Sequence, residues 1–210
     1  KNDKKMYVSF DEWNVWYRAR SGIYADGQWK EAPHLLEEIY NLEDALVCAQ
    51  YLNAFIRRAD LVKIACIAQI VNVIAPLVTN ETGVLRQSIY YPYAWALRYA
   101  RGRVLELDLE CESYPIKAEG LRPDFARDGS VPFLDVAATF DPQNGQVCLL
   151  MLNRDLTGER ELQVDWHDLT PSRVLACETL TGSDLKAANT FERPALVAPR
   201  ALEPPRVGSR

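Results

Sequence analysis

The stretch MYVSFDEWNVWY, from Met6 to Tyr17, determines how the rest of the chain is interpreted. Its first half, through Phe10, is short, apolar and rich in residues that favour β-strands. Two adjacent carboxylates, Asp11 and Glu12, follow it, and aromatic side chains spaced three and four residues apart come next. The sequence therefore predicts a strand that ends in charged and aromatic side chains.

Helix and strand patterns alternate after this stretch. Asn41 is placed as a helix N-cap, and apolar residues recur every three or four positions up to Ala59, which predicts a helix. The next run, VKIACIAQ at 62–69, is almost continuously apolar, as in a parallel strand buried on both faces. SIYYPYAWALRYARG predicts a second helix, with Pro92 early and Gly102 as a left-handed cap. This order is the repeating unit of a parallel α/β sheet or barrel.

Beyond Gly102 the apolar period changes from that of a helix to that of a strand. Short strands are predicted in VLELDLEC, FLDVAATF, QVCLLMLN, ELQVDW and SRVLACETL, with a turn at DPQNG. We expect two domains, residues 1–102 and residues 103–210. The predicted fold class is α/β plus all-β: the C-terminal part of a (β/α)8 TIM barrel, then an antiparallel, jelly-roll-like β-sandwich. The proline-rich end suggests that the sandwich lacks its last strand.

Composition excludes several classes of function. The formal net charge of −5 and the absence of a basic cluster argue against nucleic acid and anionic membranes as partners. Five scattered cysteines without a C-x-x-C spacing predict free thiols in a reducing compartment, and we expect a cytoplasmic protein. With only His34 and His167, and no Gly-rich phosphate loop, neither a metal nor another cofactor is expected.

Glu12 is the first candidate site residue. In α/β barrels the catalytic groups lie at the C-terminal ends of the strands, which is where Glu12 falls. Nearby Trp16 and Tyr17 suit a sugar, because aromatic faces pack on C–H surfaces. The alternatives are that Asp11 and Glu12 only end a strand and solvate a loop, and that the aromatic residues belong to a core, as we expect of Trp13.

Three segments carry a resemblance to a known family. SFDEWNVWY, LLEEIYNLEDALVCAQYLNAFIRRADLVKIACIAQIVNVIAPLVT and RQSIYYPYAWALRYARG closely resemble the seventh and eighth strand-helix units of the α-L-arabinofuranosidases of glycoside hydrolase family 51. VPFLDVAATFD and LLMLNRD resemble the C-terminal sandwich of that family more loosely. The resemblance covers essentially the whole chain. It implies a retaining, exo-acting enzyme that removes terminal non-reducing arabinofuranosyl residues from arabinan or arabinoxylan oligosaccharides.

The resemblance also implies roles for single residues. Glu12 in DEWN matches the catalytic nucleophile, Trp16 an aromatic residue of the sugar subsite, and Gln69 in IAQIVN a side chain that hydrogen-bonds the sugar or steadies the nucleophile. The acid/base Glu of the family follows the fourth strand, which this chain does not contain. Glu81 in TNETG repeats the Asn-Glu dipeptide, but it lies in a Thr/Gly loop and is expected to be a solvated loop residue.

The chain is accordingly expected to be the C-terminal portion of a longer enzyme, which the resemblance also implies to be a homo-oligomer, often a hexamer. The 210 residues alone should not hydrolyse arabinosides, because they lack the second carboxyl group. Turnover by the purified 210-residue chain that Glu12→Ala abolishes would contradict this prediction. Two alternatives stay open: a related glycosidase with another sugar or an endo mode, and a non-catalytic carbohydrate-binding or assembly module.

Overall fold

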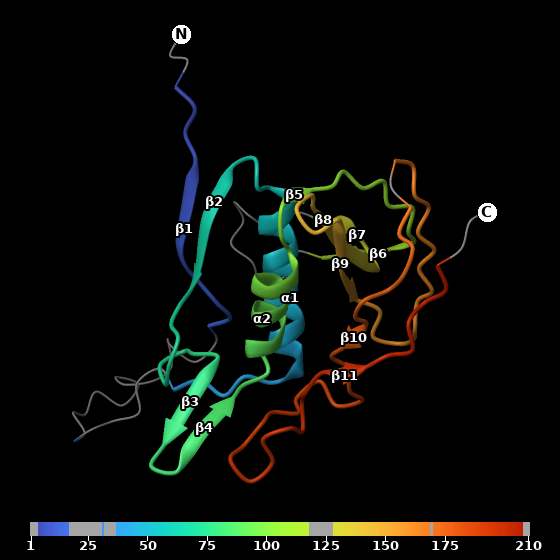
Figure 1. Cartoon of the computed structure of the whole chain (residues 1–210). Coiled ribbons are helices and arrows are strands. Elements are labelled where there is room, and N and C mark those ends of the chain that lie inside the picture. Colours follow the sequence, from blue (N-terminus) through green and yellow to red (C-terminus); the bar gives the residue numbers. More distant parts are fainter. Residues whose placement is uncertain (1–3, 17–30, 32–36, 118–127, 169, 208–210) are drawn as a thin grey trace.

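The computed structural model describes residues 4–16, 31, 37–117, 128–168 and 170–207. Figure 1 shows three layers: a parallel pair of strands, two helices in the middle, and antiparallel strands on the far side of the helices. The parallel strands are β1 (Val8–Trp13) and β2 (Val62–Ile67), and the helices are α1 (Leu42–Arg57) and α2 (Tyr90–Tyr99). Helix α1 packs against α2, β2, β8 and β9, so it contacts both outer layers.

The parallel pairing of β1 with β2 confirms the predicted α/β unit. Val8 lies opposite Val62 and Trp13 opposite Ile67. The Ala68 N–H donates to the Trp13 carbonyl at 3.1 Å, which continues the pairing past the end of β2. Strand β1 runs three residues further than Phe10, so Asp11 and Glu12 belong to the strand and not to the loop that follows it.

The predicted N-cap of α1 is also confirmed. The Asp44 N–H donates to Asn41 Oδ1 at 3.1 Å, and the Asn41 N–H donates to Asp44 Oδ2 at 2.8 Å, which forms a capping box. One apolar face of the helix enters the core of the α/β part. That core consists of Trp13, Tyr40, Cys48, Leu52, Ile67 and Ile89.

The expectation that β2 is buried on both faces is wrong for the described chain. Ile64 of β2 is 54% exposed and Phe10 of β1 is 41% exposed. The helices cover one face of the pair, whereas no described strand pairs with the outer edge of either strand. A continuously apolar strand is suited to packing on both of its faces. Within the described residues, the helices cover only one face of β2.

Between β2 and α2 lies a hairpin that the sequence analysis did not predict. Its strands are β3 (Leu77–Asn80) and β4 (Gly83–Arg86). Helix α2 ends at Tyr99, and Gly102 has the predicted positive φ, +81°, but three residues beyond the helix. A Cβ atom at Gly102 would lie 2.1 Å from the Phe140 carbonyl oxygen, so the glycine permits close approach to β8 rather than capping the helix.

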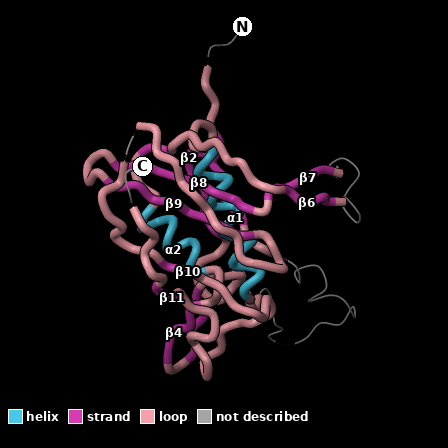
Figure 2. Tube along the Cα trace, turned by 90° about the vertical axis from the view of Figure 1, so that its right-hand side faces the viewer, coloured by secondary structure: helices cyan, strands magenta, loops and turns pink. Residues whose placement is uncertain are grey.

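The antiparallel layer is built around a long hairpin. Strands β8 (Leu134–Asp141) and β9 (Gln146–Asn153) pair in full register around the predicted DPQNG turn, and the short β5 (Arg103–Val104) pairs with the other edge of β8. Two further pairs are β6 (Ser113–Ile116) with β7 (Gly129–Pro132), and β10 (Glu178–Thr179) with β11 (Arg200–Ala201). Figure 2 shows the β6–β7 pair projecting beside β8 and β9.

Three of the predicted strands do not form as expected. VLELDLEC is a strand only at Val104, although the Leu105 N–H still donates to the Ala138 carbonyl at 2.9 Å. ELQVDW has no strand, and in SRVLACETL only Glu178–Thr179 is one. Alternating apolar residues define a face, but a strand also needs a backbone partner, which the described residues do not supply there.

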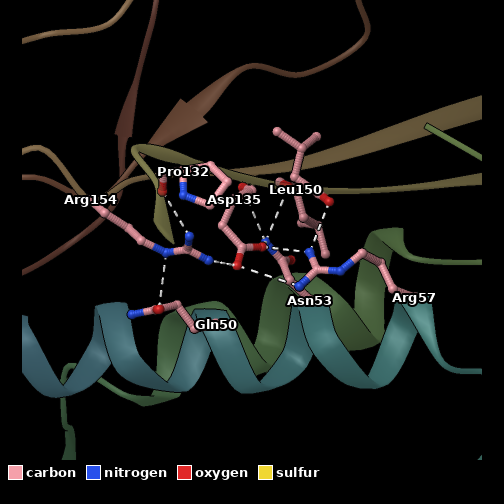
Figure 3. Close-up of polar contacts among 8 residues, drawn as sticks. Gln50, Asn53, Arg57, Pro132, Asp135, Leu150 and Arg154 are labelled. Carbon is pink, nitrogen blue, oxygen red and sulfur yellow. Dashed lines mark hydrogen bonds and ion pairs between the residues drawn. The ribbon is translucent and has the colours of Figure 1, made fainter. Parts of the chain in front are cut away.

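A buried polar cluster joins α1 to β8 and is drawn in Figure 3. We call it the Asp135 cluster; it consists of Asn53, Arg57, Asp135 and Arg154. The Asp135 carboxylate accepts from Asn53 Nδ2 at 2.9 Å and from Arg57 Nη1 at 2.6 Å, and it also pairs with Arg154. Burial raises the pKa of Asp135, but the hydrogen bonds from Arg57 and Asn53 and the charges of Arg57 and Arg154 outweigh burial, so the pKa is lowered.

Candidate active site

Glu12 and Gln69 lie at the same edge of the parallel pair. Glu12 is the last residue but one of β1, and Gln69 follows the end of β2 by two residues. Because Trp13 is opposite Ile67 in a parallel register, the carboxyl ends of the two strands meet at this edge. Glu12, Gln69 and Trp16, three residues beyond β1, are all exposed. Glu12 and Gln69 therefore lie at two adjacent strand ends, and Trp16 lies in the segment that follows β1.

Trp13 anchors this edge to the core, as predicted. It is 3% exposed, and its ring centroid lies 5.3 Å from that of Phe55, 5.7 Å from Tyr51 and 6.0 Å from Tyr93. The neighbouring Glu12 is exposed, and the pairing of β1 with β2 is irregular between Phe10 and Trp13. Within the described residues, no hydrogen bond or ion pair occupies the Glu12 carboxylate, whereas Asp11 accepts from the Ser9 hydroxyl.

The loop that carries Gln69 has its own hydrogen bonds. The Gln69 N–H donates to the Ile74 carbonyl at 3.1 Å, and the Asn72 N–H donates to the Leu77 carbonyl at 2.8 Å. Asn72 and Ile74 have positive φ angles of 67° and 41°. The loop is therefore a compact reversal of the chain that holds the Gln69 backbone at the end of β2.

Asn14 is a residue of this edge to which the sequence analysis gave no role. Its Nδ2 donates to the Ala68 carbonyl at 2.8 Å and to the Ile74 carbonyl at 2.6 Å. Its Oδ1 accepts from the Val15 N–H at 2.8 Å. The only signal for it in the sequence is its place in DEWN, two residues after Glu12, and that signal names no partner.

Other residues considered in the sequence fall elsewhere. Glu81 is exposed in the turn of the β3–β4 hairpin, which confirms that it is a solvated loop residue. Tyr17 and His34 lie outside the described residues. A surface hollow of about 370 Å³ is lined by Arg57, Asp135 and Arg154 with neighbouring α1 residues, and one of about 490 Å³ by the turn near Gly102. Neither is lined by a proposed site residue. In the part of the chain that is described, no helix has the length and apolarity needed to cross a membrane.

A parallel α/β unit with antiparallel strands packed on its helices fits the fold class expected from the sequence, the last part of a (β/α)8 barrel followed by an antiparallel β-sandwich. Comparison with known families gives the particular family. Residues 11–209 match the sequence model of the α-L-arabinofuranosidase C-terminal domain. The chain belongs to this family, and the resemblance to glycoside hydrolase family 51 is confirmed.

Individual relatives agree with this assignment. The chain is 36% identical to an intracellular exo-α-(1→5)-L-arabinofuranosidase of Streptomyces lividans, over 97% of this chain and 30% of that protein. It is 37% identical to the enzyme of the same name from Halalkalibacterium halodurans, over 90% of this chain and 36% of the relative. A solved family 51 α-L-arabinofuranosidase from Bifidobacterium longum superimposes with a TM-score of 0.79 at 34% identity, over 95% of this chain and 38% of the other. The chain thus spans about a third of the length of these relatives.

Proposed function

We propose that the protein is a retaining, exo-acting α-L-arabinofuranosidase that releases terminal arabinofuranosyl units from arabinan or arabinoxylan oligosaccharides. The observation that carries the proposal is the exposed Glu12 carboxylate at the carboxyl end of a parallel strand, in a chain that matches the family from residue 11 onward. The names of the relatives support the exo mode and an intracellular location. They include both (1→5) and (1→6) enzymes, so no linkage is assigned.

Each proposed site residue has one task. Glu12 attacks the anomeric carbon and forms a covalent arabinosyl-enzyme, which water then hydrolyses. Trp16 packs its exposed ring on the C–H face of the sugar, and Gln69 hydrogen-bonds a sugar hydroxyl. A retaining glycosidase also needs a second carboxyl group about 5–5.5 Å from the first, to protonate the leaving oxygen. We assign that role to no residue of this chain, and Glu81 is not proposed for it.

The remaining proposals concern organisation. We assign residues 1–102 to the barrel part and residues 103–210 to the sandwich, and we expect the protein to act as a homo-oligomer in the cytoplasm. The α/β elements before Gly102 and the antiparallel pairs after it support the boundary.

The stereochemistry of the product tests the proposed mechanism. The protein that carries this chain is incubated with an aryl α-L-arabinofuranoside, and the anomeric proton of the released sugar is followed by NMR from the first turnovers. Double displacement predicts that the α-anomer appears first and mutarotates later, and that peptide mapping of a trapped intermediate finds the sugar on Glu12. Initial release of the β-anomer, or an adduct on another carboxylate, would refute the mechanism with Glu12 as nucleophile.

A further inference from the structure

We propose that Asn14 is a positioning residue that sets the separation between the Glu12 carboxylate and the Gln69 side chain. The inference rests on the proposed function, because it concerns how the same site is held. Asn14 would not contact the sugar; it would act through the backbone that carries the two site residues.

The first argument is the connection that Asn14 makes. Its covalent position ties it to Glu12, two residues earlier on β1. Its Nδ2 binds the Ala68 carbonyl at 2.8 Å, and this carbonyl belongs to the residue directly before Gln69. One side chain therefore joins the carboxyl end of β1 to the residue that precedes Gln69, across the edge where regular strand pairing stops.

The second argument is a shared acceptor. The Ile74 carbonyl accepts from Asn14 Nδ2 at 2.6 Å and from the Gln69 N–H at 3.1 Å. A displacement of Asn14 would thus move or weaken the acceptor that fixes the Gln69 backbone. The loop has no regular strand pairing at Gln69 to compensate, because β2 ends at Ile67.

The third argument is that Asn14 is itself held in place. Its Oδ1 accepts from the Val15 N–H at 2.8 Å and lies 3.9 Å from Cys48 Sγ on α1. The next carbonyl, that of Val15, accepts from the hydroxyl of the fully buried Tyr40 at 3.1 Å. The amide donors and the acceptor of Asn14 are all engaged, and its backbone is fixed to the core. Such a side chain can hold the backbone carbonyls that it binds in a defined position.

Asn14 could instead serve folding alone, and Asn189 provides the matched control. Asn189 Nδ2 also donates to two carbonyls, those of Arg86 at 2.9 Å and Val197 at 2.8 Å, and its Oδ1 accepts from the Val197 N–H at 2.7 Å. It joins the C-terminal segment to the end of β4 and contacts none of the proposed site residues. Truncation of either side chain to alanine removes two bonds to carbonyls and one from a backbone N–H, and for Asn189 also a hydrogen bond with Tyr91.

The experiment is a double-mutant cycle in the protein that carries this chain, with an aryl α-L-arabinofuranoside as substrate. The variants are Asn14→Ala, Asn189→Ala, Gln69→Ala and the two doubles with Gln69→Ala. All are assayed well below their unfolding transitions, so that the folded fraction is equal. Asn14→Ala is expected to lower kcat/KM by about 10²-fold, the order of loss for an ångström-scale misplacement. Asn189→Ala should lower it by no more than about threefold.

The coupling separates positioning from folding. The Asn14→Ala/Gln69→Ala double variant should lose much less kcat/KM than the product of the two single losses. The reason is that Asn14→Ala already displaces the Gln69 side chain that the second substitution removes. Asn189→Ala and Gln69→Ala should multiply to within about twofold. The positioning role is overturned if the Asn14 and Gln69 losses multiply, if Asn14→Ala behaves like Asn189→Ala, or if Gln69→Ala has no effect.

Two further outcomes are interpretable. If Asn14→Ala does not fold, Asn14→Ser is used in the same cycle, and failure of both variants beside a folded Asn189→Ala would overturn the proposal in favour of a folding role. Wild-type turnover by Glu12→Gln would refute the proposed function itself. Loss of turnover in Glu12→Gln together with multiplicative Asn14 and Gln69 effects would refute the positioning role alone.

Discussion

Replacement of Glu12 by Gln should reduce turnover of an aryl α-L-arabinofuranoside by roughly 10⁴-fold or more, the scale seen when a covalent nucleophile is removed. The amide has nearly the same shape as the carboxylate but cannot attack the anomeric carbon. Glu12 is exposed and has no hydrogen bond or ion pair within the described residues, so the change should leave the unfolding transition nearly unaltered. Steady-state kinetics and a thermal melt of the same preparation provide the measurement.

Asp11→Asn is the matched control for this prediction. Asp11 is also exposed and directly adjacent, but it accepts from the Ser9 hydroxyl and has no proposed role. It should retain most of the wild-type activity. Activity in Glu12→Gln similar to that of Asp11→Asn, with sugar binding intact, would favour the alternative of a non-catalytic carbohydrate-binding module.

Replacement of Asp135 by Asn should destabilise the protein by about 3 kcal/mol, the lower part of the range for breaking a buried ion pair. The variant keeps the shape of the side chain but leaves Arg154 and the partly exposed Arg57 without their counter-charge in the Asp135 cluster. Urea unfolding at neutral pH should show a lower midpoint with little change in slope.

Asp60→Asn provides the surface counterpart. Arg58 and Asp60 form a similar ion pair at 3.0 Å, but their side chains are 62% and 67% exposed, so solvent screens the pair and its removal should scarcely move the midpoint. Equal shifts in the two variants would show that burial of Asp135 contributes nothing.

The pH dependence of the Asp135 cluster follows from the direction of its pKa. The pKa of Asp135 is lowered in the folded state, so its stabilisation is fully present above the ordinary value of 3.8 and is lost as the pH falls through the lower folded value. Asp135→Asn should therefore lose less stability than the wild type between pH 4 and more acidic conditions. An identical acid dependence of both proteins would contradict the assignment.

Elements set by local chemistry were predictable from the sequence. The capping box at Asn41, the apolar face of α1 and the turn at DPQNG need only neighbouring residues, and all three form as expected. The place of Glu12 at a strand end follows from the same local pattern, with an error of three residues in where β1 stops.

Elements that depend on a distant partner were not predictable. VLELDLEC alternates as well as FLDVAATF does, yet only the second finds strands on both sides. Two hydrogen bonds of Asn14 go to carbonyls more than fifty residues away, whose positions no local pattern contains. The same holds for the Asp135 cluster, in which Asn53 and Arg57 meet a carboxylate about eighty residues further along the chain.

Helix α1 has a consequence for protein engineering. One of its sides carries Cys48 and Leu52 into the core under β1, and the other carries Asn53 and Arg57 to Asp135. A graft of residues 103–210 onto another catalytic scaffold would bring Asp135 and Arg154 but neither of their helix partners. The transferable unit is therefore the β-rich part together with α1, and a fusion junction near Gly102 would cut through the interface that it is meant to preserve.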